Sequence, residues 1–364
     1  MVLYRFKLRQ TVRCITLLLI MFAASGLHAQ DATIDVPFLT VRDFDGSRGA
    51  SAAFGDARSS LRAGLCAVEE EEPSVLTDIV QSGPTFLREQ LLSVEEVKLQ
   101  SPDGLITARS SETQHGLALF VHGYFTDFDK GCRRAALLQR NAVLEERMVW
   151  FTWPSDGDIA NYVQDETDLY WSVPDIADAI LAVNAQSRDA GGADIIGHSL
   201  GGRGVALALA EVAVRAPETQ LGDVVLLAPD MDFEIFARLL PRIRPIAKRI
   251  TLYMSSADRP LDLSEELHGY PRLGQAGNNV TILDGVEVID VSRLPTESAS
   301  GHLYHIHNSV VGQDLDRLLN SGLPASQRPQ LEAMGPNIKV HLGGWGISGP
   351  GGQEILVWKS FGGE

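Results

Sequence analysis

From about residue 115, short apolar runs alternate with longer stretches of helical periodicity. The strand-length apolar runs are 117–121, 148–152, 194–196, 223–227, 250–254 and 286–291. The stretches that we predict as helices are 129–146, 173–188, 200–214, 234–248, 261–267 and 308–320. Near-continuous apolar strands separated by helices are typical of a parallel sheet buried on both faces. We therefore predict an α/β fold with a mostly parallel sheet, helices on both faces and functional loops at the carboxyl ends of the strands.

The pattern changes on both sides of this region. Residues 30–114 are mixed in character, with turn signals at 82–84 and 101–104, and we predict an N-terminal segment with a few strands packed on the core. The core itself is expected to span 115–322. Residues 323–364 form a Gly- and Pro-rich C-terminal extension with one more strand-like run at 354–358.

The first 29 residues differ in composition from the core and from both flanking segments. Four cations without an acidic residue precede a short apolar run, and small residues follow it up to Ala29. This order indicates a secretory signal peptide at 1–29, with an uncleaved anchor as the alternative. The run is short for the roughly 20 residues of a spanning helix, so we expect export to the periplasm or the medium and no stable membrane span after cleavage.

The net charge limits the kinds of partner that we expect, and the cysteines raise the question of a disulfide. The chain has 31 Lys and Arg against 47 Asp and Glu, and without residues 1–29 the net charge becomes −20. Such an acidic surface repels phosphate backbones, so we expect no nucleic acid partner. After cleavage two cysteines remain, Cys66 and Cys132. An oxidising compartment permits a bridge between them, but two separate buried thiols fit the sequence equally well.

The strongest chemical signal is Gly197-His198-Ser199-Leu200-Gly201. It lies between a predicted strand and a predicted helix, which is the setting that gives the pattern G-x-S-x-G its meaning. The glycines allow a sharp, strained turn that projects the Ser199 hydroxyl above the sheet, and we predict Ser199 as the nucleophile. The Leu200 backbone N–H is then one expected oxyanion donor. We assign His198 a structural role.

A second donor is expected from another strand end. The run 117–121 leads into His122-Gly123-Tyr124, well before the nucleophile in the chain. Gly123 would let the backbone turn toward the substrate, and we predict the Tyr124 backbone N–H as the second oxyanion donor.

A serine hydroxyl needs a base, and the base needs an orienting carboxylate. Asp258 follows the second strand after the nucleophile, where this fold carries the acid, so we predict Asp258 for that role. Asp230 is the competitor and could instead cap the helix near 234.

Three histidines, His302, His305 and His307, follow the last predicted strand of the core. We predict His302 as the base, because it follows a glycine in a loop that can reach Ser199. A metal site at these histidines is the alternative, but a His-x-x-His-x-His run alone is a weak ligand signal. We expect neither a metal nor a cofactor.

Several stretches resemble a bacterial branch of the α/β-hydrolase superfamily, known as esterase-like or lipase-like proteins of unknown function. The similar pieces are VHGYFTDFDKGCRRAALL, VWFTWPSDG, IIGHSLGGRGV, LLAPDMD, LYMSSADRPLDLSEELHGYPRLG, VEVIDVS and GHLYHIHNSVVGQDL. They cover about residues 115–320. The resemblance implies an α/β-hydrolase fold, and it implies His302 as base, because Asp314-Leu315 follows at the spacing of the family. The sequence departs from the family pattern after the serine, where it has Leu200-Gly201-Gly202.

These features lead us to expect a serine hydrolase that cleaves a small-molecule carboxylic ester through an acyl-enzyme. A catalytically silent binding protein of the same fold, a peptidase and a thioesterase are the alternatives. No long insertion follows Asp232, so we expect no large cap domain. The stretch 153–171 would form either a small lid or pocket wall or a surface loop. The sequence carries no indication of the acyl chain, the alcohol or the oligomeric state.

Overall fold

The computed structural model describes residues 33–70, 85–187, 191–295, 298, 300–334 and 355–358. The chain divides into a short unit, Met1–Thr33, and a main unit, Ile34–Glu364, which is described below. The predicted signal peptide at 1–29 and the turn signal at 82–84 lie outside the described residues.

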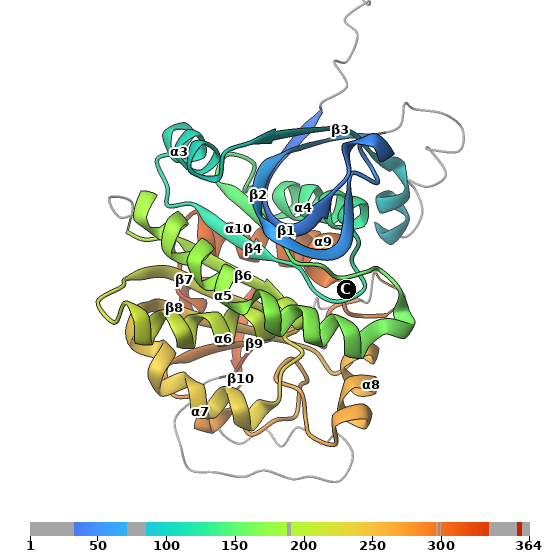
Figure 1. Cartoon of the computed structure of the whole chain (residues 1–364). Helices are drawn as coiled ribbons and strands as arrows, with labels where there is room; N and C mark the ends of the chain where they lie inside the picture. Colours follow the sequence, from blue (N-terminus) through green and yellow to red (C-terminus); the bar gives the residue numbers. More distant parts are fainter. Residues whose placement is uncertain are drawn as a thin grey trace, which may run out of the picture. The chain divides into compact units, whose positions relative to one another are not determined.

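Within the described residues the main unit contains one eleven-stranded sheet, with the order β10-β11-β9-β8-β7-β6-β4-β5-β1-β2-β3 (Figure 1). The six strands predicted from the apolar runs are β4 (Ala118–Val121), β5 (Met148–Thr152), β6 (Asp194–His198), β7 (Leu221–Leu227), β8 (Ala247–Met254) and β9 (Val286–Asp290). They pair in parallel throughout. The predicted α/β class with a mostly parallel sheet is therefore confirmed.

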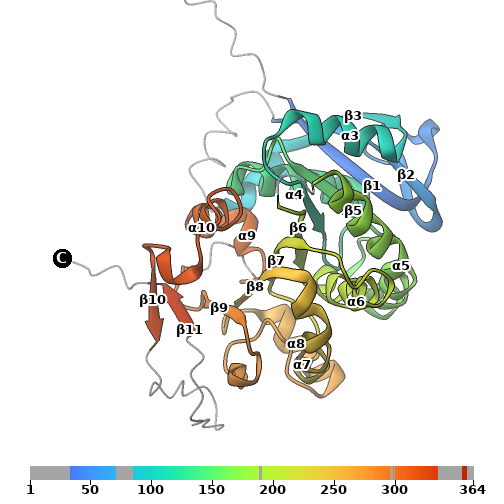
Figure 2. The ribbon, with the colours of Figure 1, turned by 90° about the vertical axis from the view of Figure 1, so that its left-hand side faces the viewer.

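Side chains alternate between two cores, one on each face of the sheet. In β5, Val149 and Phe151 pack with one core, whereas Met148 and Trp150 pack with the other. This double burial explains why the strands are apolar at consecutive positions. Helices cover both faces (Figure 2). The first core contains residues of α3 (Pro102–Glu112), α5 (Tyr162–Gln186), α6 (Leu200–Arg215) and α7 (Phe233–Ile243), and the second contains residues of α4 (Phe128–Ala142), α9 (Tyr304–His307) and α10 (Ser309–Leu319).

The flanking segments extend the sheet. From the leading segment, β1 (Ile34–Phe44) pairs in parallel with β5, and β2 (Phe54–Glu70) and β3 (Leu92–Gln100) continue the sheet as antiparallel strands. At the other edge, β11 (Ile355–Trp358) pairs in parallel with β9, and β10 (Leu331–Met334) pairs antiparallel with β11. The remaining short helical turns are η1 (Gly46–Arg48), η2 (Thr85–Leu91), η3 (Ile159–Asn161), η5 (Arg244–Ile246), η6 (Val280–Ile282) and η7 (Ala325–Gln327).

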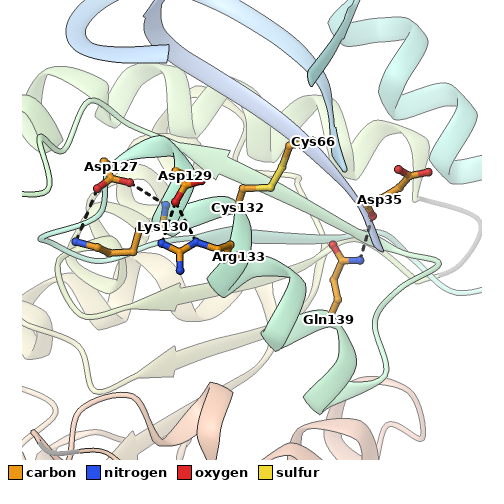
Figure 3. Close-up of a disulfide and its surroundings, with 8 residues drawn as sticks. All are labelled: Asp35, Cys66, Asp127, Asp129, Lys130, Cys132, Arg133 and Gln139. Carbon is orange, nitrogen blue, oxygen red and sulfur yellow. Dashed lines mark hydrogen bonds and ion pairs between the residues drawn. A yellow bond between two sulfur atoms is a disulfide. The ribbon is translucent and has the colours of Figure 1, made fainter. Parts of the chain in front are cut away.

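A disulfide between Cys66 and Cys132 joins β2 to α4, with the two Cα atoms 6.6 Å apart (Figure 3). Both residues are fully buried. The sequence left this pairing open. In the structure it attaches the leading segment to the helix that begins a few residues after His122.

Three local expectations were wrong. The turn signal at 101–104 is the start of α3, because Ser101 caps that helix by accepting a hydrogen bond from the Gly104 N–H at 3.2 Å, and Pro102 occupies its first turn. The helix predicted at 173–188 begins at Tyr162 and continues through Pro174. Asp230 does not cap α7, because Asp232 accepts the hydrogen bond from the Ile235 N–H at 2.9 Å.

Most of the stretch 153–171 is therefore helical. It contains η3 and the first turns of α5. Between β7 and β8, where every residue is described, the chain forms only α7 and η5, so no cap domain is inserted there. Among the described helices, none combines the length and the apolar character that crossing a bilayer requires.

Candidate active site

Ser199 occupies the sharp turn between β6 and α6. Its backbone has φ 55° and ψ −125°, an unusual conformation for a residue with a side chain. The turn is packed so tightly that a Cβ atom on Gly201 would lie 2.3 Å from the His122 carbonyl oxygen. Two backbone hydrogen bonds fix the serine, from its N–H to the Leu227 oxygen and from the Asp230 N–H to its oxygen, each at 3.0 Å.

The loop after β4 lies directly against this serine. A Cβ atom on Gly123 would be 2.7 Å from the Ser199 Cβ, so only glycine allows this approach. The predicted donors come from the residue after the serine and from the loop after β4. Leu200 is the first residue of α6, so no carbonyl within the helix can accept its N–H. Tyr124 follows Gly123 in the loop that contacts Ser199.

His122 holds the start of this loop. Its Nδ1–H donates to the Gly123 oxygen at 2.7 Å, and its Nε2 accepts from the Thr152 hydroxyl at 3.1 Å. Its ring stacks on Trp153, with centroids 5.0 Å apart and planes inclined by 6°. Burial, together with the charge of Arg42, holds the pKa of His122 well below its ordinary value. His122 is therefore a neutral structural group with a defined tautomer.

Asp258 and His302 are in contact. The His302 Nδ1 lies 2.7 Å from Oδ2 and 2.9 Å from Oδ1 of Asp258, and both residues are buried. Asp258 also caps α8 (Arg259–His268) by accepting the Leu261 N–H at 3.2 Å. Burial raises the pKa of the Asp258 carboxyl above its ordinary value, and the interaction with His302 opposes that rise.

His302 also lies beside the serine turn. Its ring centroid is 4.6 Å from that of His198, the residue before Ser199, and the His198 Nε2–H donates to the His302 carbonyl at 3.2 Å. The His305 ring also packs against His198, with centroids 4.1 Å apart and planes inclined by 33°. Burial lowers the pKa values of His198 and His305 far below the ordinary histidine value, so both stay neutral near pH 7.

His307 is mostly buried, and burial lowers its pKa to about 4. Across the part of the chain that the structure describes, no group of three His, Cys, Asp or Glu side chains is arranged to hold a metal ion.

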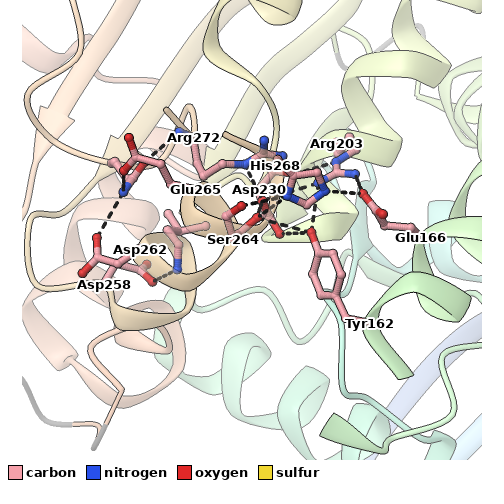
Figure 4. Close-up of polar contacts among 12 residues, drawn as sticks. Tyr162, Glu166, Arg203, Asp230, Asp258, Asp262, Ser264, Glu265, His268 and Arg272 are labelled. Atoms are coloured by element: carbon pink, nitrogen blue, oxygen red, sulfur yellow. Dashed lines mark hydrogen bonds and ion pairs between the residues drawn. The ribbon is translucent and has the colours of Figure 1, made fainter. Parts of the chain in front are cut away.

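Asp230, the competing acid, belongs to a different cluster (Figure 4). Its carboxylate accepts hydrogen bonds from the hydroxyls of Tyr162 and Ser264, each at 2.6 Å, and from the Arg272 guanidinium at 2.8 Å. Arg203, one turn after the nucleophile, donates to the Asp230 carbonyl at 2.6 Å. Arg203 and Arg272 overcome the cost of burial and lower the pKa of Asp230. Asp230 is thus an ionised anchor that ties α5, α6 and α8 together.

Arg203 connects this cluster to further residues of α5 and α8. Arg203 pairs with Glu166 and also donates to the Tyr170 hydroxyl at 3.1 Å. Glu166 in turn accepts from the His268 Nε2–H at 3.0 Å. Sequence reasoning missed this cluster around Asp230 and Arg203. The i,i+4 spacing of Tyr162, Glu166 and Tyr170 was the signal that could have revealed them, because these residues share one face of α5.

The sheet with a serine on the turn between β6 and α6 defines an α/β-hydrolase fold. Residues 100–320 match the family described as alpha/beta hydrolase of unknown function (DUF900), and the chain belongs to this family. The suspected superfamily is thereby confirmed.

Solved structures also resemble the chain, and curated proteins give no match. A predicted CIB-like hydrolase from Thermoplasma acidophilum is 18% identical with a TM-score of 0.33, and the alignment covers 62% of this chain and 91% of that one. An esterase from Pyrobaculum calidifontis is 13% identical with a TM-score of 0.35, over 70% of this chain and 100% of that one. A fungal esterase from Rhizomucor miehei is 13% identical with a TM-score of 0.37, over 69% and 92%.

Proposed function

We propose that this protein is an exported serine hydrolase that cleaves carboxylic ester bonds of small molecules. The observation that carries the proposal is the contact between His302 Nδ1 and the Asp258 carboxylate, next to the turn that bears Ser199. A histidine oriented in this way has its other ring nitrogen, Nε2, available as a base.

In the first step, Nε2 of His302 takes the Ser199 proton while Oγ bonds to the ester carbonyl carbon. The N–H groups of Leu200 and Tyr124 donate to the negatively charged oxygen that develops. His302 then returns the proton to the leaving alkoxide as its C–O bond breaks. Water, deprotonated by the same histidine, attacks the acyl carbonyl carbon. The bond from this carbon to Ser199 Oγ then breaks as His302 returns the proton to Oγ, and the acid is released.

Two features support export. Residues 1–29 have the order of a signal peptide, and the Cys66–Cys132 disulfide is of a kind that persists in oxidising compartments. Fractionation of cells that produce the full chain tests this part directly. Mature protein that begins near residue 30 outside the cytoplasm supports export, and uncleaved cytoplasmic protein contradicts it.

The activity is tested with p-nitrophenyl esters of graded acyl length, compared with a matched anilide and a thioester. We expect ester turnover that is lost in Ser199→Ala and retained in Ser321→Ala, a substitution at an exposed serine after α10. Turnover of the anilide alone would indicate a peptidase, and preference for the thioester a thioesterase. Folded protein that turns over none of the three would contradict the proposal and favour a binding protein.

A further inference from the structure

The loop that carries Tyr124 has a strained backbone at the next residue. Phe125 has φ 60°, in the left-handed region that a bulky side chain rarely adopts. Such a conformation persists only where the surroundings hold it. The peptide group that joins Tyr124 to Phe125 is therefore oriented by contacts from outside the loop.

Asp165, fully buried in the first turn of α5, makes these contacts. Its Oδ2 accepts the Phe125 N–H at 3.3 Å and the Ser155 hydroxyl at 2.5 Å. Ser155 in turn accepts the Thr126 N–H at 2.9 Å. Two consecutive N–H groups of the loop are thus held by Asp165, one directly and one through Ser155, while its Oδ1 accepts the Asp156 N–H at 3.2 Å.

Arg42 of β1 holds the carbonyl side of the same segment. Its buried guanidinium donates to the oxygens of Thr126 at 2.7 Å and Ser155 at 2.8 Å. It also donates to the Thr152 hydroxyl at 2.9 Å. The Phe125 N–H thus points to the Asp165 carboxylate, and the Thr126 N–H to the hydroxyl that donates to it. The Thr126 carbonyl points to a cation, so an ionised Asp165 matches the loop in both charge and hydrogen-bond direction.

We propose that Asp165 is a positioning residue whose ionised carboxylate holds the oxyanion loop in the conformation that aims the Tyr124 N–H at the substrate. The inference rests on the proposed function. Asp165 takes no part in bond making, and it acts through the backbone of Phe125 and Thr126.

The ionisation of Asp165 makes this role depend on pH. Burial raises the pKa of Asp165 to about 6, and the hydrogen bonds from Ser155, Asp156 and Phe125 oppose the rise. Three charged or titratable groups from other elements interact electrostatically with it, namely Arg42 of β1, Tyr124 after β4 and Asp156 after β5. Lys130 of α4 faces the same loop and donates to the Phe125 oxygen at 3.2 Å. A proton on the carboxyl replaces one acceptor position with a donor, and the loop loses part of its support as the pH falls through about 6.

The kinetic consequence is specific. An oxyanion donor acts mainly in the transition state, so its misplacement lowers kcat and leaves KM nearly unchanged. Complete loss of one donor costs about 10²–10³ in rate. Displacement of the loop should therefore cost about 10-fold or more in kcat.

The test compares Asp165→Asn with Asp168→Asn, which makes the same change in the same helix. Asp168 pairs with Arg58 at 2.6 Å and has no contact with the loop in the described part of the chain. Active sites are counted by fluorophosphonate titration, and kcat, KM and the pH profile are measured per active site. Ser155→Ala, which breaks the link from Asp165 to Thr126, provides a second variant if Asp165→Asn does not fold.

We expect Asp165→Asn and Ser155→Ala to lower kcat per site by about 10-fold or more with KM within about threefold, and Asp168→Asn to match the wild type. As the pH falls through about 6, the ratio of kcat/KM in the wild type to kcat/KM in Asp165→Asn should fall toward one, because protonation of Asp165 removes the same support from the wild-type loop.

Three results would overturn the inference. One is a normal kcat per site in Asp165→Asn or Ser155→Ala, with only the number of sites reduced. Another is a ratio of wild-type to Asp165→Asn kcat/KM that stays constant as the pH falls through about 6. Wild-type protein that is neither labelled nor active would remove the proposed function itself, and the inference with it.

Discussion

The Nδ1 atom of His302 lies 2.7 Å from Oδ2 of Asp258, in a buried pair that joins the loop after β9 to the start of α8. A carboxylate in this position keeps the proton on Nδ1 and stabilises the imidazolium that forms during catalysis. We expect Asp258→Asn to lower kcat by about 10⁴, because the amide favours the wrong histidine tautomer. Ester hydrolysis per folded protein measures the effect.

Asp262→Asn is the matched control, since Asp262 is an exposed carboxylate in the same helix. It should keep wild-type activity. Equal activity in Asp258→Asn and Asp262→Asn would show that the buried pair does not serve catalysis.

Asp230→Asn should lower the stability of the protein much more than its activity, in contrast to Asp258→Asn. The substitution removes the negative charge that Arg203 and Arg272 share. Arg203 keeps its pair with Glu166, but leaving the buried Arg272 guanidinium without this partner costs about 3–5 kcal/mol of unfolding free energy. The backbone bond from the Asp230 N–H to Ser199 remains. We therefore expect a large drop in the urea midpoint and a much smaller loss of kcat per active site than in Asp258→Asn. A stable Asp230→Asn variant without activity would contradict the anchoring role.

The Cys66–Cys132 bridge closes a loop with a sequence separation of 66 residues. Constraining the unfolded chain over that length should stabilise the fold by about 4 kcal/mol in the chain-entropy treatment. We expect the double variant Cys66→Ser/Cys132→Ser to unfold at a correspondingly lower urea concentration, and reduced wild-type protein to behave in the same way. Identical unfolding of oxidised and reduced wild type would refute this contribution.

The buried His305 makes the free energy of unfolding depend on pH. Burial lowers its pKa far below 6.5, so below pH 6.5 the unfolded chain binds a proton that the folded chain excludes. The stability that depends on this group is complete above pH 6.5 and is lost as the pH falls. In urea unfolding, His305→Gln should reduce the slope of the unfolding free energy against pH by up to about 1.4 kcal/mol per pH unit. An unchanged slope in His305→Gln would mean that the buried imidazole is protonated in the native state.

The elements that the sequence predicted best are those whose signals are local. The apolar run 148–152 coincides with β5, and G-x-S-x-G locates the turn before α6. The start of α5 was missed because Asn161 makes no side-chain capping bond there, whereas Pro174 resembles a first helical residue. α3 was missed because Ser101-Pro102 also begins many turns, and only Leu105 and Ile106 of that helix are buried.

In the candidate site, too, the residues with local sequence signals were predicted and the residues without them were missed. Ser199, Asp258 and His302 were predicted from a motif, from chain order and from their places after strands. The side chains that support them depend on contacts between distant segments. Arg42 reaches Thr126, 84 residues further along the chain, and Asp165 reaches Phe125, 40 residues before it. A single sequence has no periodicity or spacing that encodes such pairs.

Labelling with a fluorophosphonate, followed by peptide mapping, tests most directly whether Ser199 is an activated nucleophile. The reagent reacts with a serine only where a base accepts its proton. We expect one adduct per chain, located on Ser199, with labelling lost in Ser199→Ala and strongly slowed in His302→Ala. An adduct on another residue, or folded wild-type protein that stays unlabelled, would contradict the account.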